Sequence, residues 1–289
     1  MRVFVTGVKG QLGHDVMNEL AKRGHEGIGV DIEEMDITDA ESVRKVITEA
    51  NPDVVIHCAA WTAVDLAEDD DKKEKVHQVN AVGTENIAKV CHDLDCKMIY
   101  ISTDYVFDGQ GTRPWEPDDE RHPLNVYGQT KYEGELAVEK WVKKILHRPH
   151  RMGIRRERKE LHQDHAEPWK DTRSSDCVDD QVGSPTYTYD LSRLLVDMAE
   201  KENYGRYHAT NEGLCSWYEF ACEIFKQAAE IDPAYGKVSV SPVSSDQYPA
   251  KAKRPSNSRM SKEKLTENGF EKLPTWQDAL HRYLREIEF

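Results

Sequence analysis

Few features of this sequence suit an oxidising compartment, a membrane or a nucleic-acid partner. Its six cysteines form no CxxC pair and no dense framework, a pattern typical of free thiols in a reducing compartment. No apolar run approaches the roughly 18 residues of a membrane span, and no secretory segment precedes the first apolar stretch. A net charge of −14 leaves little basic surface for nucleic acid or anionic lipid. We therefore expect a cytoplasmic protein with no nucleic-acid and no membrane partner.

The first 110 residues alternate short apolar segments with amphipathic ones. Thr38 with Glu41 predicts a capping box at the start of one of the helices. Strand, helix, strand at this spacing implies a parallel sheet with helices on both faces. The sequence therefore predicts an α/β protein with a doubly wound, Rossmann-like sheet. The predicted strands are 2–6, 27–31, 53–58 and 97–102, and the predicted helices are 11–23, 39–50 and 72–93.

Beyond residue 178 the pattern is less regular. We expect helices at 190–201, 217–229 and 276–287 and a short strand at 206–209. We divide the chain into a dinucleotide-binding domain at 1–144, an anomalous segment at 145–177, and a smaller, mainly substrate-binding region at 178–289. This C-terminal region is expected to interleave with the first domain.

A GxxGxxG turn directly follows the first predicted strand: Gly7, Gly10 and Gly13, with Gln11 and Leu12 between the last two. Glycines at a strand-to-helix junction let the backbone approach a pyrophosphate, whose charge is met by the helix N-terminus. The alternative is a tight turn without a ligand. The position of the turn at the first such junction favours a dinucleotide site.

An acidic cluster follows the second predicted strand. Asp31 lies 24 residues after Gly7, where a carboxylate binds the ribose hydroxyls of a dinucleotide. Glu33 and Glu34 come next and no arginine is near, so a 2′-phosphate would be repelled. The sequence therefore predicts NADH or NADPH as the cofactor, with NADH preferred.

A YxxxK pair, Tyr127 and Lys131, would lie one turn apart on a helix. A lysine ammonium beside a phenol lowers the phenol's pKa, which would make Tyr127 a proton donor near neutral pH. A surface tyrosine with a solvated lysine is the alternative. Thr103, at the end of the fourth predicted strand, would supply a second hydroxyl at the ligand-binding edge of the sheet.

Further motifs extend over nearly the whole chain. With the features above, they make it similar to the extended short-chain dehydrogenase/reductase superfamily and, within it, closely to the dTDP-4-dehydrorhamnose reductase family. The motifs are Asp36-Ile37-Thr38, Ala59-Ala60-Trp61-Thr62-Ala63-Val64-Asp65, Asn80-Ala81-Val82-Gly83-Thr84, Ser102-Thr103-Asp104-Tyr105-Val106-Phe107, Gly183-Ser184-Pro185-Thr186 and Arg254-Pro255-Ser256-Asn257-Ser258-Arg259.

The resemblance implies reduction of the C4 keto group of dTDP-4-dehydro-6-deoxy-L-mannose to give dTDP-L-rhamnose. It implies a catalytic triad of Thr103, Tyr127 and Lys131, with Tyr127 protonating the alkoxide and Lys131 holding the cofactor ribose. Thr103 and Asp104 would touch the sugar. The oligomeric state stays open, a homodimer included, and no metal site is assigned. The residues implied to line the cofactor are Gln11, Leu12, Asp31, Asp36, Ile37, Ala60, Trp61 and Thr62.

Basic residues cluster late in this acidic chain, at Lys251, Lys253, Arg254 and Arg259. We expect them, Arg254 above all, to meet the diphosphate of the nucleotide sugar; a solvated loop is the alternative. A sugar dehydratase of the superfamily would carry Asp-Glu after the threonine, whereas here Tyr105 follows Asp104. A second reading is a catalytically silent subunit that resembles the β subunit of methionine adenosyltransferase.

Residues 145–177 read unlike the rest of the chain. These 33 residues hold four of the twelve histidines and eight lysines and arginines. The resemblance implies a buried strand here, similar to Ile-Val-Arg-x-x-Trp-Val-Phe-Gly, then a helix similar to Asn-Phe-x-Lys-Thr-Met-Leu. Neither is present in the literal sequence. We therefore expect this chain to lack an interior strand of the sheet and the tryptophan that packs against the sugar.

The genetic code can explain why residues 145–177 depart from the family pattern. Met152-Gly153 must be encoded ATG GGN, and reading from the second nucleotide gives TGG, tryptophan, where the family has one. The same offset lets residues 147–150 read as Ile-Val-Arg-Ile and 157–166 as Asn-Gly-Lys-Asn-Phe-Ile-Lys-Thr-Met-Leu. We interpret 145–177 as translated out of frame between two compensating shifts. A basic patch, a histidine metal site at His162 and His165, and a disordered insert are the alternatives.

Overall fold

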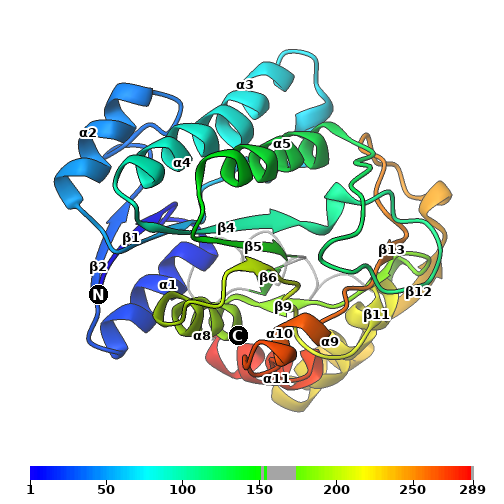
Figure 1. Cartoon of the computed structure of the whole chain (residues 1–289). Helices are drawn as coiled ribbons and strands as arrows, with labels where there is room; N and C mark the ends of the chain where they lie inside the picture. Colours follow the sequence, from blue (N-terminus) through cyan, green and yellow to red (C-terminus); the bar gives the residue numbers. More distant parts are fainter. Residues whose placement is uncertain (151–152, 155–173, 288–289) are drawn as a thin grey trace.

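A six-stranded parallel sheet organises the molecule (Figure 1), a computed structural model that describes residues 1–150, 153–154 and 174–287. Its strand order, β10-β5-β4-β3-β1-β2, reverses direction of winding at β1, which is the hallmark of a doubly wound sheet. The predicted fold class is confirmed. The strands are β1 (Arg2–Thr6), β2 (Glu26–Val30), β3 (Val54–His57), β4 (Lys97–Thr103), β5 (Ile145–His150) and β10 (Gly205–Arg206).

Helices cover both faces of this sheet and bury a separate core on each (Figure 1). Alternate side chains of β1 point to opposite faces: Val3 and Val5 join one core, whereas Phe4 joins the other. The face of Val3 and Val5 carries α1 (Gln11–Lys22) and α8 (Thr188–Glu200). The face of Phe4 carries α2 (Ala40–Ala50), α4 (Gly83–Asp93) and α5 (Val126–Trp141).

One local prediction on this face is wrong and another is confirmed. The predicted capping box does not form, because Thr38 bonds to the side chain of Asp36, and Asp39 caps α2 by accepting from the backbone of Glu41 and Ser42. The helix predicted over 72–93 is confirmed, with α3 (Lys73–His77) and α4 joined without a break by a π-helical turn at Gln78–Val82. Such single turns often place a functional side chain.

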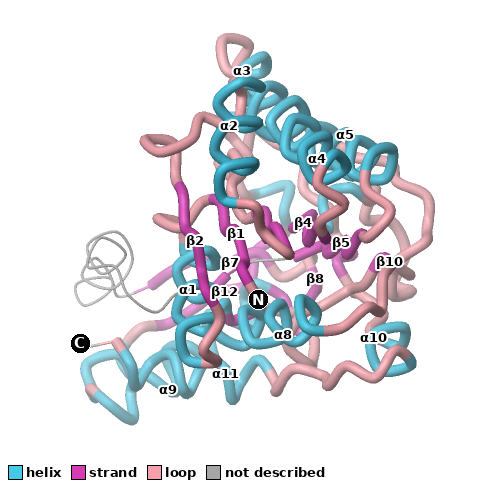
Figure 2. Tube along the Cα trace, turned by 60° about the vertical axis from the view of Figure 1, so that its left-hand side comes forward, coloured by secondary structure: helices cyan, strands magenta, loops and turns pink. Residues whose placement is uncertain are grey.

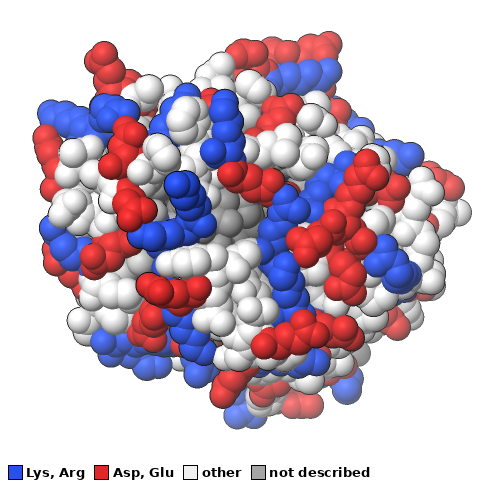
Figure 3. All heavy atoms as spheres, in the orientation of Figure 1, with Lys and Arg blue, Asp and Glu red and all other residues white. Residues whose placement is uncertain are grey.

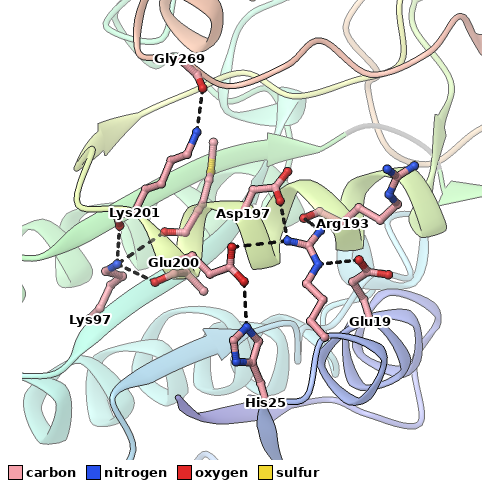
Figure 4. A network of polar contacts seen from close by, with 11 residues as sticks. Glu19, His25, Lys97, Arg193, Asp197, Glu200, Lys201 and Gly269 are labelled. Atoms are coloured by element: carbon pink, nitrogen blue, oxygen red, sulfur yellow. Dashed lines mark hydrogen bonds and ion pairs between the residues drawn. The ribbon is translucent and has the colours of Figure 1, made fainter.

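A polar network fastens α8 to the sheet (Figure 4). The Lys97 ammonium donates to the carbonyls of Ala199, at 2.8 Å, and Lys201, at the end of α8 where helical carbonyls lack partners. Burial lowers the pKa of Lys97. Nearby, the Arg23 guanidinium bridges Glu19 at 2.7 Å and Asp197 at 2.6 Å, and so joins α1 to α8. The helix α8, from the C-terminal half of the chain, is thus bonded to β4 and α1 of the N-terminal half.

The remaining C-terminal elements lie beside the sheet (Figures 1 and 2). The Ser216 hydroxyl and Glu219 form a capping box at the start of α9. The division of the chain at residues 144 and 178 stays a prediction. The elements are β8 (Val182–Gly183), β11 (Cys215–Ser216) and β13 (Asn257–Ser258) in one sheet, β7 (Ser174–Val178) with β12 (Ser239–Val243), β6 (Gly153–Ile154) with β9 (Thr186–Tyr187), and the helices α9 (Trp217–Ile231), α10 (Glu263–Glu267) and α11 (Trp276–Glu286).

The expectation that an interior strand is missing is wrong for the backbone. Residues Ile145–His150 form β5, which pairs in parallel with β4 from Met98 to Thr103 and with β10 on its other side. A strand ladder is built from backbone N–H and C=O groups, so an unusual composition does not prevent pairing. Residues 151–152 and 155–173, with His162 and His165, lie outside the described residues.

Charged side chains of both signs are interspersed on the face drawn in Figure 3, around a recess near its middle. Lysines and arginines border this recess, with aspartates and glutamates beside them. In the part of the chain that the structure describes, no helix has the length and apolar character needed to span a bilayer.

Candidate active site

The candidate site lies at the carboxyl edge of the parallel sheet, where the ends of β1, β2, β3 and β4 meet. The glycine turn follows β1, Asp31 follows β2, the segment of Ala60 and Trp61 follows β3, and Thr103 ends β4. In open α/β sheets ligands bind at this edge, near the point where the strand order reverses. The fold therefore brings together most of the residues that the sequence singled out.

The glycine turn is packed so tightly that side chains are excluded from it. Gly7 has a φ of +71°, and a Cβ there would come within 2.8 Å of the Ala59 backbone. A Cβ on Gly13 would lie 2.3 Å from the Gly7 carbonyl oxygen. Gly10 caps α1, with its backbone in an extended conformation. Gln11 and Leu12 form the first turn of that helix, so its N-terminal amides face the edge where a pyrophosphate would lie.

Asp31 contacts the glycine turn directly. Its Oδ2 accepts from the backbone N–H of Lys9 at 2.9 Å, and its Oδ1 from that of Ile32 at 2.9 Å. The carboxylate is therefore fixed beside the glycine turn. Lys9 is a cation that the sequence reading left out: its Nζ lies 2.5 Å from Glu33 Oε2.

Asp36 and Ile37 differ in how they are placed. Asp36 is exposed, and its Oδ1 accepts from the backbone and hydroxyl of Thr38. Ile37 is buried against α4, where a Cβ on Gly83 would come within 2.8 Å of its side chain. Asp36 is therefore open to solvent, whereas the Ile37 side chain belongs to the core.

The segment after β3 is anchored by Asn80, a residue that the sequence reading quoted without a role. The Asn80 side chain accepts from the Trp61 backbone at 2.8 Å and donates to Thr130 Oγ1 at 3.2 Å. It therefore ties the cofactor-side segment to α5. Ala60 and Trp61 are half-buried beside it, whereas Thr62 is exposed. The π-helical turn places Asn80 in this position.

Thr103 and Tyr127 meet at the end of β4. The Thr103 hydroxyl lies close enough to the Tyr127 phenol to oppose the rise that burial imposes on the pKa of Tyr127. Tyr105 packs edge-on against the phenol ring, with ring centroids 5.5 Å apart. Asn125 caps α5 by accepting from Gly128 N at 2.7 Å, which fixes the first turn, and Tyr127 with it.

The pKa of Tyr127 shifts in the direction opposite to the prediction. Burial raises the pKa of Tyr127 instead of a neighbouring ammonium lowering it. The Lys131 Nζ turns toward β4, where it donates to the Ile101 carbonyl at 2.6 Å and lies 4.2 Å from the centre of the Tyr100 ring. Spacing along a helix predicts a shared face but not where a long side chain ends. Burial lowers the pKa of Lys131 to about 7.

Asp104 and Arg254 already have protein partners. Asp104 is buried and accepts from Thr103 Oγ1 at 3.2 Å and from Ser258 Oγ, on β13, at 2.6 Å. Arg254 makes a two-point ion pair with Asp65, on the segment that follows β3. Asp65 and Ser258 were missed by the sequence reading, although both stand within motifs that it quoted.

The comparison with known proteins agrees with the fold and with the geometry of the candidate site. The family model described as "RmlD substrate binding domain" matches residues 1–289. A dTDP-4-dehydrorhamnose reductase of Mycolicibacterium smegmatis is 38% identical over 96% of this chain and 84% of its own length.

Two solved structures are similar over 99% of both chains. One is a dTDP-4-dehydrorhamnose reductase from Clostridium acetobutylicum, with a TM-score of 0.91 and 34% identity. The other, from Bacillus anthracis, is in complex with NADP and has a TM-score of 0.89 and 35% identity.

Proposed function

The chain belongs to the family of dTDP-4-dehydrorhamnose reductases, and from this premise we propose that it reduces a dTDP-4-keto-6-deoxy sugar with NADH or NADPH. The substrate is dTDP-4-dehydro-6-deoxy-L-mannose and the product dTDP-L-rhamnose. The observation that carries the proposal is the contact of Thr103 with Tyr127 at the same edge of the sheet as the glycine turn.

The residues around the glycine turn fit a dinucleotide. The space beside Gly7 and Gly13 admits no side chain, which leaves backbone amides of the turn and of α1 to bind phosphate oxygens. Asp31 would accept from the ribose hydroxyls. When bound, the nicotinamide supplies the hydride. The site residues therefore need only bind and orient the cofactor and the sugar, and protonate the sugar oxygen.

Proton transfer falls to Tyr127. Reduction of a ketone leaves an alkoxide, and the Tyr127 hydroxyl would donate its proton to that oxygen while Thr103 donates a hydrogen bond to it. The Lys131 ammonium, enclosed beneath them, would stabilise the phenolate that results and would hold the nicotinamide ribose. The high pKa of Tyr127 keeps the phenol protonated before the reaction.

The substrate would enter between the end of β4 and the segment before β13. Asp104 would contact the sugar, and Arg254 would meet the diphosphate. Both side chains are held in place by neighbours, Ser258 and Asp65, so the site is largely formed before substrate binds. A preformed site lowers the entropy cost of binding.

The experiment is NADH and NADPH oxidation by the full chain with dTDP-4-keto-6-deoxy-L-mannose, with the product identified by NMR. We expect Tyr127→Phe to lower kcat by about 10²- to 10⁴-fold, the usual contribution of a general acid. Tyr132→Phe, on the same helix and packed against Val106 and Phe107, is the matched control and should keep full activity. If the unmodified chain binds the cofactor but does not reduce the sugar, the chain is instead a catalytically silent subunit.

A further inference from the structure

The helix α5 places three ionisable side chains four residues apart, Tyr127, Lys131 and Glu135, on one face. Two of them hold consecutive residues of β4. Lys131 Nζ donates to the Ile101 carbonyl at 2.6 Å, and Ser102 Oγ donates to Glu135 Oε1. The next residue along β4 is Thr103. Two turns of α5 are therefore bonded to the strand end that positions the Thr103 hydroxyl.

Glu135 is a buried acid, only 1% exposed, and not a surface residue of α5. Its second oxygen accepts from Arg121 Nε at 3.1 Å, and the Arg121 guanidinium also donates to the carbonyls of Pro117, at 2.8 Å, and Asp119. A buried carboxylate is tolerated when it is paired and hydrogen-bonded, as it is here. Burial raises the pKa of Glu135, and the Arg121 ion pair with the Ser102 hydrogen bond opposes that rise and so favours the charged carboxylate.

We propose that Glu135 is a positioning residue for the reduction: through Ser102 it fixes the strand end at Thr103, and its carboxylate, one turn along α5 from Lys131, favours the charged form of that lysine. This inference rests on the proposed function for its catalytic meaning. The inference goes beyond the proposed function because Glu135 lies outside the triad of Thr103, Tyr127 and Lys131. Among the described residues, Glu135 makes no direct contact with Tyr127.

The groups around Lys131 support this role. Glu135 faces it from α5, Tyr100 from β4, and His57 and Cys58 from the end of β3. Burial lowers the pKa of His57 to about 3 and raises that of the Cys58 thiol to about 12, so both are neutral near pH 7. Burial also raises the pKa of Tyr100. The charge of Glu135 opposes the effect of burial on the pKa of Lys131, and Cys58 acts in the same sense when it is a thiolate.

Two variants separate the two parts of the role. Glu135→Gln keeps an oxygen to accept from Ser102 but removes the charge, so the pKa of Lys131 should fall. The high-pH limb of the kcat profile should then move to lower pH by about 1 unit, the effect of one nearby charge. Ser102→Ala keeps the charge and removes the hydrogen bond. It should lower kcat without moving that limb.

The pKa of Lys131 can also be measured without turnover, by NMR titration of ¹³C-labelled lysine with Lys131→Arg to assign the signal. A drop of about 1 unit in Glu135→Gln is expected whether or not the chain reduces the sugar, so failure of the proposed function is distinguishable. If Glu135→Gln fails to fold because Arg121 loses its partner, the double variant Arg121→Met with Glu135→Met removes both charges. An unchanged Lys131 pKa in a folded variant would overturn the inference.

Discussion

Arg254 and Asp65 are 189 positions apart in the sequence, yet they form a two-point ion pair with Nη1–Oδ1 at 3.1 Å and Nη2–Oδ2 at 2.6 Å. Asp65 also accepts from the Ala252 backbone at 3.0 Å, and Asn125 donates to the Lys253 carbonyl at 2.8 Å. The segment before β13 is thereby joined to the segment after β3 and to the start of α5. Asp65 thus fixes the guanidinium that is expected to meet the diphosphate.

Loss of Asp65 should therefore impair substrate binding more than chemistry. We expect Asp65→Ala to raise KM for the dTDP sugar about 10-fold or more, since hydrogen bonds to charged groups contribute about 1.5 to 3 kcal/mol. The kcat should change less, and KM for NADH should not change. Arg44→Ala, which breaks an exposed ion pair with Asp93 between α2 and α4, is the control. Equal KM values for Asp65→Ala and the control would contradict the expectation.

Cofactor preference depends on the charges beside Asp31. Glu33 holds the Lys9 ammonium at 2.5 Å, which keeps this cation from a 2′-phosphate, and Glu33 itself adds a repelling charge. We expect NADH to be preferred in the unmodified chain. Glu33→Gln should raise kcat/KM for NADPH relative to NADH by about 10-fold, because it removes the repulsion and frees Lys9.

Steady-state rates with both cofactors test this prediction. Glu26→Gln removes an exposed acid at the far end of β2, where it pairs with Arg2 at 3.2 Å, and should leave the ratio unchanged. A ratio that responds equally to both substitutions would show that overall charge, and not the pairing with Lys9, sets the preference.

Lys131 should lower the stability of the protein. Burial lowers its pKa from 10.5 to about 7, so folding costs roughly 1.4 kcal/mol per unit while the lysine is charged in both states. The cost is full below pH 7 and shrinks as pH rises from 7 toward 10.5, because only the folded form loses its proton there. Lys131→Met should thus raise the free energy of unfolding most at pH 6, less at pH 9, and abolish turnover. Urea denaturation at the two pH values measures this, and an equal gain at both would contradict it.

Local patterns predicted most of the fold but few of the site's contacts. The strand at Arg2–Thr6 and the glycine turn after it follow from periodicity and turn chemistry, which depend on neighbouring residues. The pairs Asp104–Ser258 and Arg121–Glu135 join distant segments, and no local rule relates them. The predicted lowering of the Tyr127 pKa is wrong for a related reason, because tertiary packing buries the phenol and directs the Lys131 ammonium to the Ile101 carbonyl.

The reading frame of residues 145–177 gives the last prediction. The literal sequence places eight lysines and arginines in 33 residues, whereas the offset reading restores Ile-Val-Arg-Ile and a tryptophan. The described part, β5, occupies an interior position between β4 and β10, where parallel strands are usually apolar. Each apolar side chain gained in such a position contributes roughly 1.5 to 3 kcal/mol.

Resequencing codons 140–180 should reveal a single-base shift near codon 144 and its reversal near codon 177. A chain expressed with the restored frame should melt at higher temperature and turn over faster than the literal chain. If the frame stands as written and restoring it changes neither quantity, residues 145–177 are a genuine insert.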